Sequence, residues 1–160
     1  MIKLLFMDID GTLTDGKIYI GREGEVMKGF DVKDGYAIHT ILRQNGIEPV
    51  IITGRESEIV RRRAQELNVR LLYQNVSDKS KKIQEQLQEC DNVNGYDEVA
   101  YIGDDLNDLP AMLMIKEKGG VVGCPNDAVK DVKEISHYIC KNKGGNGAVR
   151  EYIEWLIDRG

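Results

Sequence analysis

The sequence lacks any apolar run long enough to cross a membrane, and only three cysteines occur among its 160 residues. Cys90, Cys124 and Cys140 show no spacing typical of metal ligands, so we expect free thiols in a reducing cytoplasm. An excess of positive charge is also lacking: 22 Lys and Arg stand against 27 Asp and Glu, and the formal net charge of −5 disfavours a nucleic-acid partner. A predicted strand begins at the start of the chain, and we expect no signal peptide and no membrane contact.

Internal repeats and low-complexity tracts are absent as well. A length of 160 residues is enough for one domain with a hydrophobic core and is short for two domains that each need their own core. The contents of 41% hydrophobic and 31% charged residues are typical of a globular domain. We therefore expect a single domain over residues 1–160.

Short apolar runs bounded by turns alternate with amphipathic segments along the chain. Strands are predicted at 2–7, 49–52, 69–73, 99–102, 119–123 and 136–139. Helices are predicted at 35–45 with Asp34 as N-cap, 56–67, 79–89, 109–115, from 125–128 onward, and 148–157. This alternation predicts a three-layer α/β/α Rossmann-like sandwich with a mostly parallel sheet.

Residues 17–20 and 25–30 alternate polar and apolar side chains around a glycine-bearing turn. Such a pattern predicts a β-hairpin that projects just after the first strand. An isolated hairpin is marginally stable in water, so we expect it to pack against another subunit. The alternative interpretation is an exposed hairpin that has no role.

Two acidic residues end the first predicted strand, in the segment Asp8-Ile9-Asp10-Gly11-Thr12. Ligands of open parallel sheets bind outside the carboxyl ends of the strands. Carboxylates there can hold a hard cation, and one of them can attack a phosphoryl group. An ordinary strand-to-turn ending would look the same.

A denser acidic segment, 103–108, follows the strand at 99–102 and carries Asp104, Asp105 and Asp108. Three carboxylates within five residues repel one another, and a divalent cation would remove that cost. An acidic turn that caps the next helix is the alternative.

Between these acidic segments, other polar residues also follow predicted strand ends. Thr53-Gly54-Arg55 suits an oxyanion, because a hydroxyl and backbone amides can donate to it. A threonine that caps the next helix is the alternative. Lys79 stands in the first turn of a helix, where the helix dipole disfavours a cation, and this favours a role in neutralising phosphate. An ordinary surface lysine is the alternative. A glycine loop at 144–147 precedes the last helix and reads either as an anion site or as a plain linker.

The order Asp-x-Asp-Gly-Thr, Thr-Gly-Arg, Lys and Gly-Asp-Asp-x-x-Asp resembles the haloacid dehalogenase superfamily of phosphotransferases over nearly the whole chain. This resemblance implies that Asp8 attacks phosphorus and forms an aspartyl phosphate. It implies that Asp10 protonates the leaving alcohol and later takes a proton from water. Thr53 and Lys79 then hold the phosphoryl oxygens.

The same resemblance implies a Mg²⁺ site built from the Asp8 carboxylate, the Asp10 carbonyl oxygen and Asp104. Asp105 and Asp108 would support these ligands and Lys79. Only the hairpin and one helix lie between Asp10 and Thr53, so this chain resembles the branch without a cap domain. In this superfamily, the residue at the position of Thr12 favours phosphatase activity, and Thr12 fits that pattern.

Further segments are similar to the 3-deoxy-D-manno-octulosonate 8-phosphate phosphatases: 18–19, 24–25, Lys28, Phe30, Val32, 34–36, 51–55 and 144–151. The resemblance implies a homotetramer in which hairpins associate and a neighbouring subunit completes each pocket. The substrate-binding residues that it implies are Asp10, Asp31, Val32, Lys33, Asp34, Gly35, His39, Arg55, Arg63 and Lys79. The arginines suit the carboxylate of a sugar acid.

Three residues depart from that family's pattern: Lys33, His39 and Asn146 stand where arginine is common. Phosphatases of nine-carbon nonulosonate 9-phosphates share the architecture and are the alternative. Arg55 favours the eight-carbon acid, because the nine-carbon branch tends to place an acidic residue there. Two further alternatives are a phospho-receiver or regulatory binding module and a catalytically inactive subunit.

Overall fold

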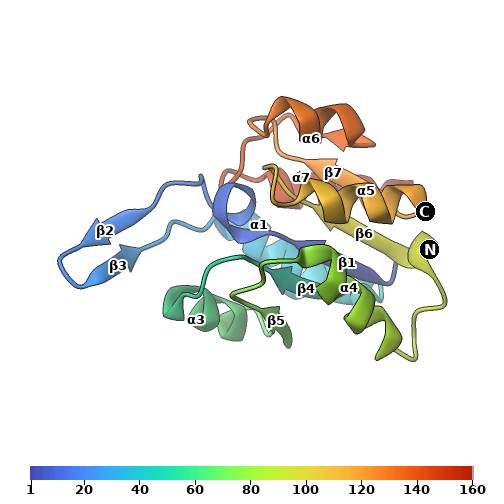
Figure 1. Cartoon of the computed structure of the whole chain (residues 1–160), viewed down its shortest axis with the longest axis horizontal. Helices are drawn as coiled ribbons and strands as arrows, with labels where there is room; N and C mark the ends of the chain where they lie inside the picture. Colours follow the sequence, from blue (N-terminus) through green and yellow to red (C-terminus); the bar gives the residue numbers. More distant parts are fainter. Residues whose placement is uncertain (160) are drawn as a thin grey trace.

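Six strands form one sheet in the computed structural model of the chain, which describes residues 1–159 (Figure 1). In spatial order they are β5 (Leu71–Tyr73), β4 (Glu48–Ile52), β1 (Leu4–Met7), β6 (Val99–Ile102), β7 (Val121–Cys124) and β8 (Tyr138–Ile139). All neighbouring pairs are parallel. Parallel pairing requires crossover connections, and helices supply most of them. The predicted α/β sandwich is confirmed.

The helices are α1 (Val32–Tyr36), α2 (Leu42–Gln44), α3 (Glu58–Glu66), α4 (Lys79–Gln88), α5 (Leu109–Glu117), α6 (Lys130–Ile135) and α7 (Ala148–Asp158). A helical segment, Ala37–Ile41, joins α1 and α2 into one continuous helix, which we call helix 32–44. Among residues 1–159, no helix has both the length and the apolar content that a membrane crossing requires.

Strand β1 is buried on both of its faces. Leu5 and Met7 pack in a core with helix 32–44, α3 and α7. Leu4 and Phe6 point the other way and pack with α4, α5 and α6. Each of these four side chains is at most 2% exposed, and burying one contributes about 1.5–3 kcal/mol. The central strand therefore anchors both layers of helices.

The strand order places a topological switch at β1. β1 lies between β4 and β6, so the chain passes from β1 to β4 on one side and reaches β6 on the other side only later. In open α/β sheets, ligands bind outside the carboxyl ends of the strands at such a switch. Asp8, Thr53 and Gly103 directly follow β1, β4 and β6 and therefore lie at this edge.

The predicted hairpin is confirmed, with strands β2 (Tyr19–Gly21) and β3 (Gly24–Met27). It extends away from the sheet, as the light-blue ribbon in Figure 1 shows. Its apolar side chains Ile20, Val26 and Met27 are 73%, 59% and 53% exposed. The hairpin therefore carries an apolar surface that the described part of this chain leaves uncovered.

The first helix begins earlier than predicted. Asp31 is the N-cap, because its side chain accepts hydrogen bonds from the backbone N–H groups of Lys33 (2.7 Å) and Asp34 (3.2 Å). The assignment of Asp34 as N-cap was wrong. Both aspartates fit the local pattern of a cap, and the tertiary environment decides between them, since Asp34 is buried and bonds to another helix.

Several other boundaries also differ from the prediction. The predicted strands at 69–73 and 136–139 are shorter, as β5 and β8, and the strand predicted at 119–123 is displaced to Val121–Cys124. The helix predicted from 125–128 begins only at Lys130. Element ends depend on hydrogen-bond partners from other segments, which local sequence patterns do not specify.

Candidate active site

A tight turn after β1 brings the first acidic segment against the second. Gly11 has a φ of +99°, a conformation that residues with a Cβ rarely adopt. A Cβ at this position would lie 2.0 Å from Oδ2 of Asp104. Because glycine carries no side chain, the turn can approach the loop after β6 this closely, and Asp8 meets Asp104.

Lys79 lies between two buried carboxylates. Its Nζ is 2.6 Å from Oδ1 of Asp8 and 2.6 Å from Oδ1 of Asp108, and all three side chains are at most 4% exposed. Burial by itself lowers the pKa of Lys79, but the two carboxylates raise it above its usual value overall. The lysine is thus held as a cation inside the protein.

Asp108 organises the loop after β6. Its Oδ1 accepts hydrogen bonds from Lys79 and from the Tyr101 hydroxyl, each at 2.6 Å. Its Oδ2 accepts from the backbone N–H groups of Asp104 (3.0 Å) and Asp105 (3.3 Å). Both of its oxygens are therefore occupied by donors of this chain.

Three carboxylates could hold a metal ion, since Asp8, Asp104 and Asp108 each offer an oxygen and these atoms lie within 4.8 Å of one another. Thr12 donates a hydrogen bond of 3.0 Å to Oδ1 of Asp104 and orients it. Because Asp108 already bonds four donors, Asp8 and Asp104 are the two that remain for an ion. Carboxylate oxygens suit a hard divalent cation such as Mg²⁺.

The electrostatics of this cluster also favour a cation. Burial, and then the charge of Asp108, raise the pKa of Asp8, against the opposing effect of Lys79. Burial, and then the charges of Asp8 and Asp108, raise the pKa of Asp104. A bound divalent cation would offset this repulsion and keep both carboxylates ionised.

A cleft of about 390 Å³ opens above these residues at the carboxyl edge of the sheet. Its lining comes from the segments that follow β1, β4 and β6 and comprises Asp8, Asp10, Gly16, Ile18, Thr53, Gly54, Arg55, Asp105, Leu106 and Asn107. The cleft has the nucleophile and acid–base candidates on its wall and a positive charge, Arg55, beside them. The fold thus brings together acidic and cationic groups that the sequence holds far apart.

Other predicted substrate-binding residues do not line this cleft. Asp31, Asp34, Gly35 and Arg63 border a nearly filled recess with a volume of about 10 Å³. Two more, Val32 and Lys33, are exposed on the first turn of helix 32–44.

His39 is also exposed, and its ring contacts the side chain of Asn68 at 3.1 Å. Within one chain, therefore, the structure joins Arg55 to the cleft but not His39 or the residues at 31–35.

The glycine loop at 144–147 packs against the turn after β1. Gly145 donates a backbone hydrogen bond of 3.1 Å to the carbonyl of Thr12. A Cβ on Gly144 would lie 1.9 Å from the carbonyl oxygen of Gly11. Gly144 and Gly145 thus pack against backbone, which accounts for these two glycines without an anion.

Lys28 was noted only as part of the family resemblance and was given no role in the site, yet its Nζ lies 2.5 Å from Oδ1 of Asp10. A lysine in a hairpin carries no local signal of this contact, because the folding back of the hairpin creates it. Tyr101 was missed as well, although a tyrosine within a buried apolar strand does indicate a hydroxyl that needs a partner.

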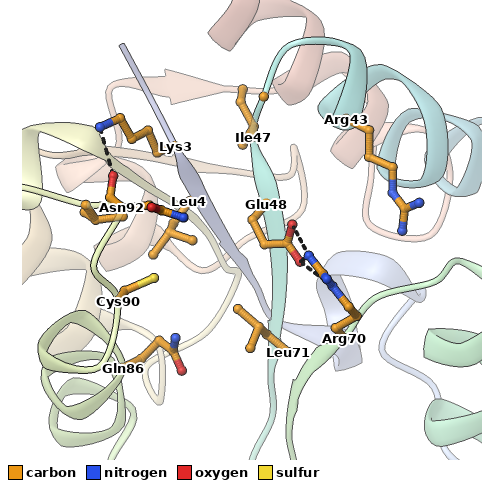
Figure 2. Close-up of a pocket in the computed structure, with 12 residues that line it drawn as sticks. Lys3, Leu4, Arg43, Ile47, Glu48, Arg70, Leu71, Gln86, Cys90 and Asn92 are labelled. Atoms are coloured by element: carbon orange, nitrogen blue, oxygen red, sulfur yellow. Dashed lines mark hydrogen bonds and ion pairs between the residues drawn. The ribbon is translucent and has the colours of Figure 1, made fainter.

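A second hollow, of about 440 Å³, lies at the opposite, amino-terminal edge of the sheet. Figure 2 shows its charged side chains, among which Lys3 bonds to the Asn92 carbonyl and Arg70 pairs with Glu48. Lys3 also pairs with Glu98, and Arg43 donates to the carbonyl of Asn68, so each of these cations already has a partner in the chain.

Comparison with known proteins shows similarity over nearly the whole chain. The 3-deoxy-D-manno-octulosonate 8-phosphate phosphatase KdsC of Yersinia pestis is 39% identical over 158 residues, which cover 98% of this chain and 80% of that protein. No protein-family model matches the chain.

Solved structures agree with this similarity. The crystal structure of 3-deoxy-D-manno-octulosonate 8-phosphate phosphatase from Moraxella catarrhalis, in complex with a magnesium ion, a phosphate ion and a KDO molecule, has a TM-score of 0.88 and 38% identity, over 98% of this chain and 86% of that one. The cobalt-bound deoxy-D-mannose-octulosonate 8-phosphate phosphatase of Haemophilus influenzae has a TM-score of 0.89 and 32% identity, over 98% and 88%. The chain therefore belongs to the family of 3-deoxy-D-manno-octulosonate 8-phosphate phosphatases, within the haloacid dehalogenase superfamily.

Proposed function

We propose that this chain is a Mg²⁺-dependent phosphatase that hydrolyses 3-deoxy-D-manno-octulosonate 8-phosphate. The observation that carries the proposal is the buried contact of Asp8 with Lys79, next to Asp104, at the wall of a cleft. The Moraxella relative binds magnesium, phosphate and the KDO sugar acid, which supports the same ligands here.

In the first step we assign the attack to Asp8. A carboxylate oxygen of Asp8 forms a bond to phosphorus while the bond between phosphorus and the sugar oxygen breaks. Asp10, also on the cleft wall, gives its proton to the departing sugar oxygen. The products are the free sugar acid and a phosphorylated Asp8.

In the second step Asp10 acts in the opposite direction. It takes a proton from a water molecule whose oxygen attacks phosphorus, and the bond from phosphorus to Asp8 breaks. Inorganic phosphate leaves, and Asp10 is protonated again. Lys79 and Thr53 are assigned to hold the phosphoryl oxygens throughout.

We assign the metal to Asp8, Asp104 and the carbonyl oxygen of Asp10, with Asp105 and Asp108 as their supports. When bound, Mg²⁺ neutralises charge on the phosphoryl group and fixes its orientation. The four donors on Asp108 support this division of roles, since they leave that side chain no free oxygen.

For the sugar acid, we assign Arg55 as the partner of the carboxylate, because it is the cationic side chain among the cleft-lining residues. We assign four other residues to the cleft of a neighbouring subunit, where they would contact the sugar acid: Asp31, Val32, Lys33 and His39. Arg63 needs to turn away from Glu66, which it contacts at 3.1 Å, to reach a ligand. Asp34 and Gly35 are buried, so their part is to shape this surface.

We further propose a cytoplasmic homotetramer of single phosphatase domains, residues 1–160, with no cap insertion. The exposed Ile20, Val26 and Met27 support hairpin association, because an apolar surface of this kind is stabilised by a partner. A neighbouring subunit would then cover the open cleft.

The test is phosphate release by the protein and by Asp8→Asn with Mg²⁺. We expect the substitution to reduce kcat by at least about a thousandfold, because an amide cannot act as the nucleophile. Asp15→Asn is the matched control, since Asp15 is exposed and outside the cleft lining. Full activity of Asp8→Asn would contradict the mechanism.

The substrate is tested with a panel that contains octulosonate 8-phosphate, N-acylneuraminate 9-phosphate, the deaminated nonulosonate 9-phosphate and hexose phosphates. We expect the highest kcat/KM for the eight-carbon acid. A preference for a nine-carbon acid would contradict the assignment of Arg55. No release from any ester, with a long-lived phosphoryl group on Asp8, would indicate a receiver-like module.

A further inference from the structure

Lys28 joins the hairpin to the cleft. Its side chain is 1% exposed although it follows the end of β3, and its Nζ lies 2.5 Å from Oδ1 of Asp10 and 2.8 Å from Oε1 of Glu25. Burial by itself lowers the pKa of Lys28, but hydrogen bonds and charges from Asp10 and Glu25 raise it overall. The group between the two carboxylates is thus an ammonium ion.

Glu25 ties this lysine to the main body of the protein. The second oxygen of Glu25 accepts a hydrogen bond from the Ser57 hydroxyl. Ser57 is the N-cap of α3, where its Oγ accepts from the backbone N–H of Val60 at 3.3 Å. Its own N–H donates to Oε1 of Gln74 at 2.8 Å. Lys28 is therefore fixed by a chain of contacts that ends on α3 and on the segment after β5.

Lys28 lies behind Asp10 rather than on the wall of the cleft. Lys28 is not among the residues that line the cleft, while Asp10 is, and the lysine already contacts two carboxylates. Among the described residues, Oδ2 of Asp10 has no hydrogen-bond donor, and Oδ1 is occupied by Lys28. One oxygen of Asp10 is thus held and the other is left for proton exchange.

We propose that Lys28 is a positioning residue, which holds Oδ1 of Asp10 so that Oδ2 faces the leaving sugar oxygen. This inference rests on the proposed phosphatase function. It makes the hairpin a part of the catalytic apparatus of its own subunit, in addition to any contact with a neighbour. A misplacement of about 1 Å at a catalytic group can lower a rate a hundredfold, so such a contact has kinetic consequences.

The test compares leaving groups in Lys28→Met, which keeps the length of the side chain and removes its charge. The sugar alcohol of octulosonate 8-phosphate needs a proton to leave, whereas the phenolate of 4-nitrophenyl phosphate does not. We expect kcat/KM to fall by at least about tenfold for the sugar phosphate and by less than about threefold for the aryl ester. For the aryl ester we expect kcat to fall instead, because Asp10 must still activate water.

Two controls separate positioning from other roles. Lys17→Met removes an exposed lysine near the base of the same hairpin, and we expect wild-type constants. Lys28→Arg keeps the charge, and we expect it to recover part of the lost kcat/KM. The inhibition constant of the product sugar acid should stay within about twofold in Lys28→Met, since no contact of Lys28 with the sugar is invoked.

Other outcomes would overturn the inference. An equal loss of kcat/KM for both esters, or wild-type constants, would show that Lys28 does not position the acid. Weaker binding of the product sugar acid would show instead that Lys28 contacts the substrate. Failure of the proposed function is recognised separately, because the unsubstituted protein would then release phosphate from neither ester, or Asp8→Asn would retain activity on both.

Discussion

Single carboxylates decide the chemistry at the carboxyl edge of the sheet. Asp8 and Asp108 are buried, Asp104 is half-buried beside them, and Lys79 compensates only part of their charge. Repulsion between buried carboxylates destabilises the folded state, so the site is expected to gain stability from a cation. Metal binding and protein stability are therefore linked in this chain.

This linkage predicts a pH-dependent effect of Mg²⁺ on stability. The pKa of Asp8 is raised from 3.8 to about 7, and that of Asp104 from 3.8 to about 8. In the metal-free protein, the free energy of unfolding falls as pH rises toward these raised pKa values. The reason is that the folded protein must then release protons that the unfolded chain has already lost. Mg²⁺ binds the ionised groups. We expect it to raise Tm more at pH 8 than at pH 6 in thermal unfolding.

The control is Asp104→Asn, which removes one ionised ligand. We expect a smaller Mg²⁺-induced rise in Tm for this variant at pH 8. An effect of Mg²⁺ that has the same size at both pH values in the unsubstituted protein would contradict the assignment of Asp8 and Asp104 as ligands.

Contacts between whole elements hold the loops of the site in place. Asp34, in helix 32–44, is 1% exposed, and its carboxylate accepts hydrogen bonds from the backbone N–H groups of Gly147 (3.3 Å) and Arg150 (2.7 Å). A side chain of one helix thus caps the N-terminus of α7, where a negative charge is favourable. The same contact fixes the glycine loop that supports the turn after β1.

Asp34→Ala is expected to reduce the free energy of unfolding by about 1–3 kcal/mol, because it leaves the N–H groups of Gly147 and Arg150, at the start of α7, without this acceptor. Urea unfolding measures this change. Asp131→Ala is the control, since Asp131 is exposed in the first turn of α6, and we expect a change within about 0.5 kcal/mol. Equal stability of both variants would show that Asp34 does not cap α7.

Element types could be predicted from local patterns, while several boundaries could not. The buried run at β1 and the amphipathic stretch at α7 carry a strong periodic signal. The start of helix 32–44 was misplaced because Asp31 and Asp34 are both good N-cap residues by sequence. The choice between them depends on α7, which lies more than a hundred residues further along the chain.

At the scale of the whole molecule, the hairpin extends from the sheet with apolar side chains exposed (Figure 1). We expect Ile20→Asp combined with Val26→Asp to lower the mass of the assembly in size-exclusion chromatography with light scattering, because charges would be buried in the hairpin contact. Val129→Asp is the control, as Val129 is 37% exposed outside the hairpin. A fully active monomer of the unsubstituted chain would contradict the shared pocket.

The sequence by itself determined the fold class and the chemistry of the strand ends. Apolar runs of strand length and helical periodicity are local properties, and Asp8, Thr53, Lys79 and Asp104 each follow such a run or begin a helix. The rule that strand ends of a parallel sheet share one edge then places these residues together without coordinates. The order of residues along the chain was sufficient to predict this part of the site.

Only the tertiary structure decided which groups touch. The contact of Lys28 with Asp10 arises because the hairpin folds back, and the bond from Asp34 to α7 joins distant segments. Such contacts depend on the relative positions of elements to within a few ångströms, and no local pattern records those positions. Side-chain partners, and with them the pKa values of the buried carboxylates, therefore became visible only in the folded chain.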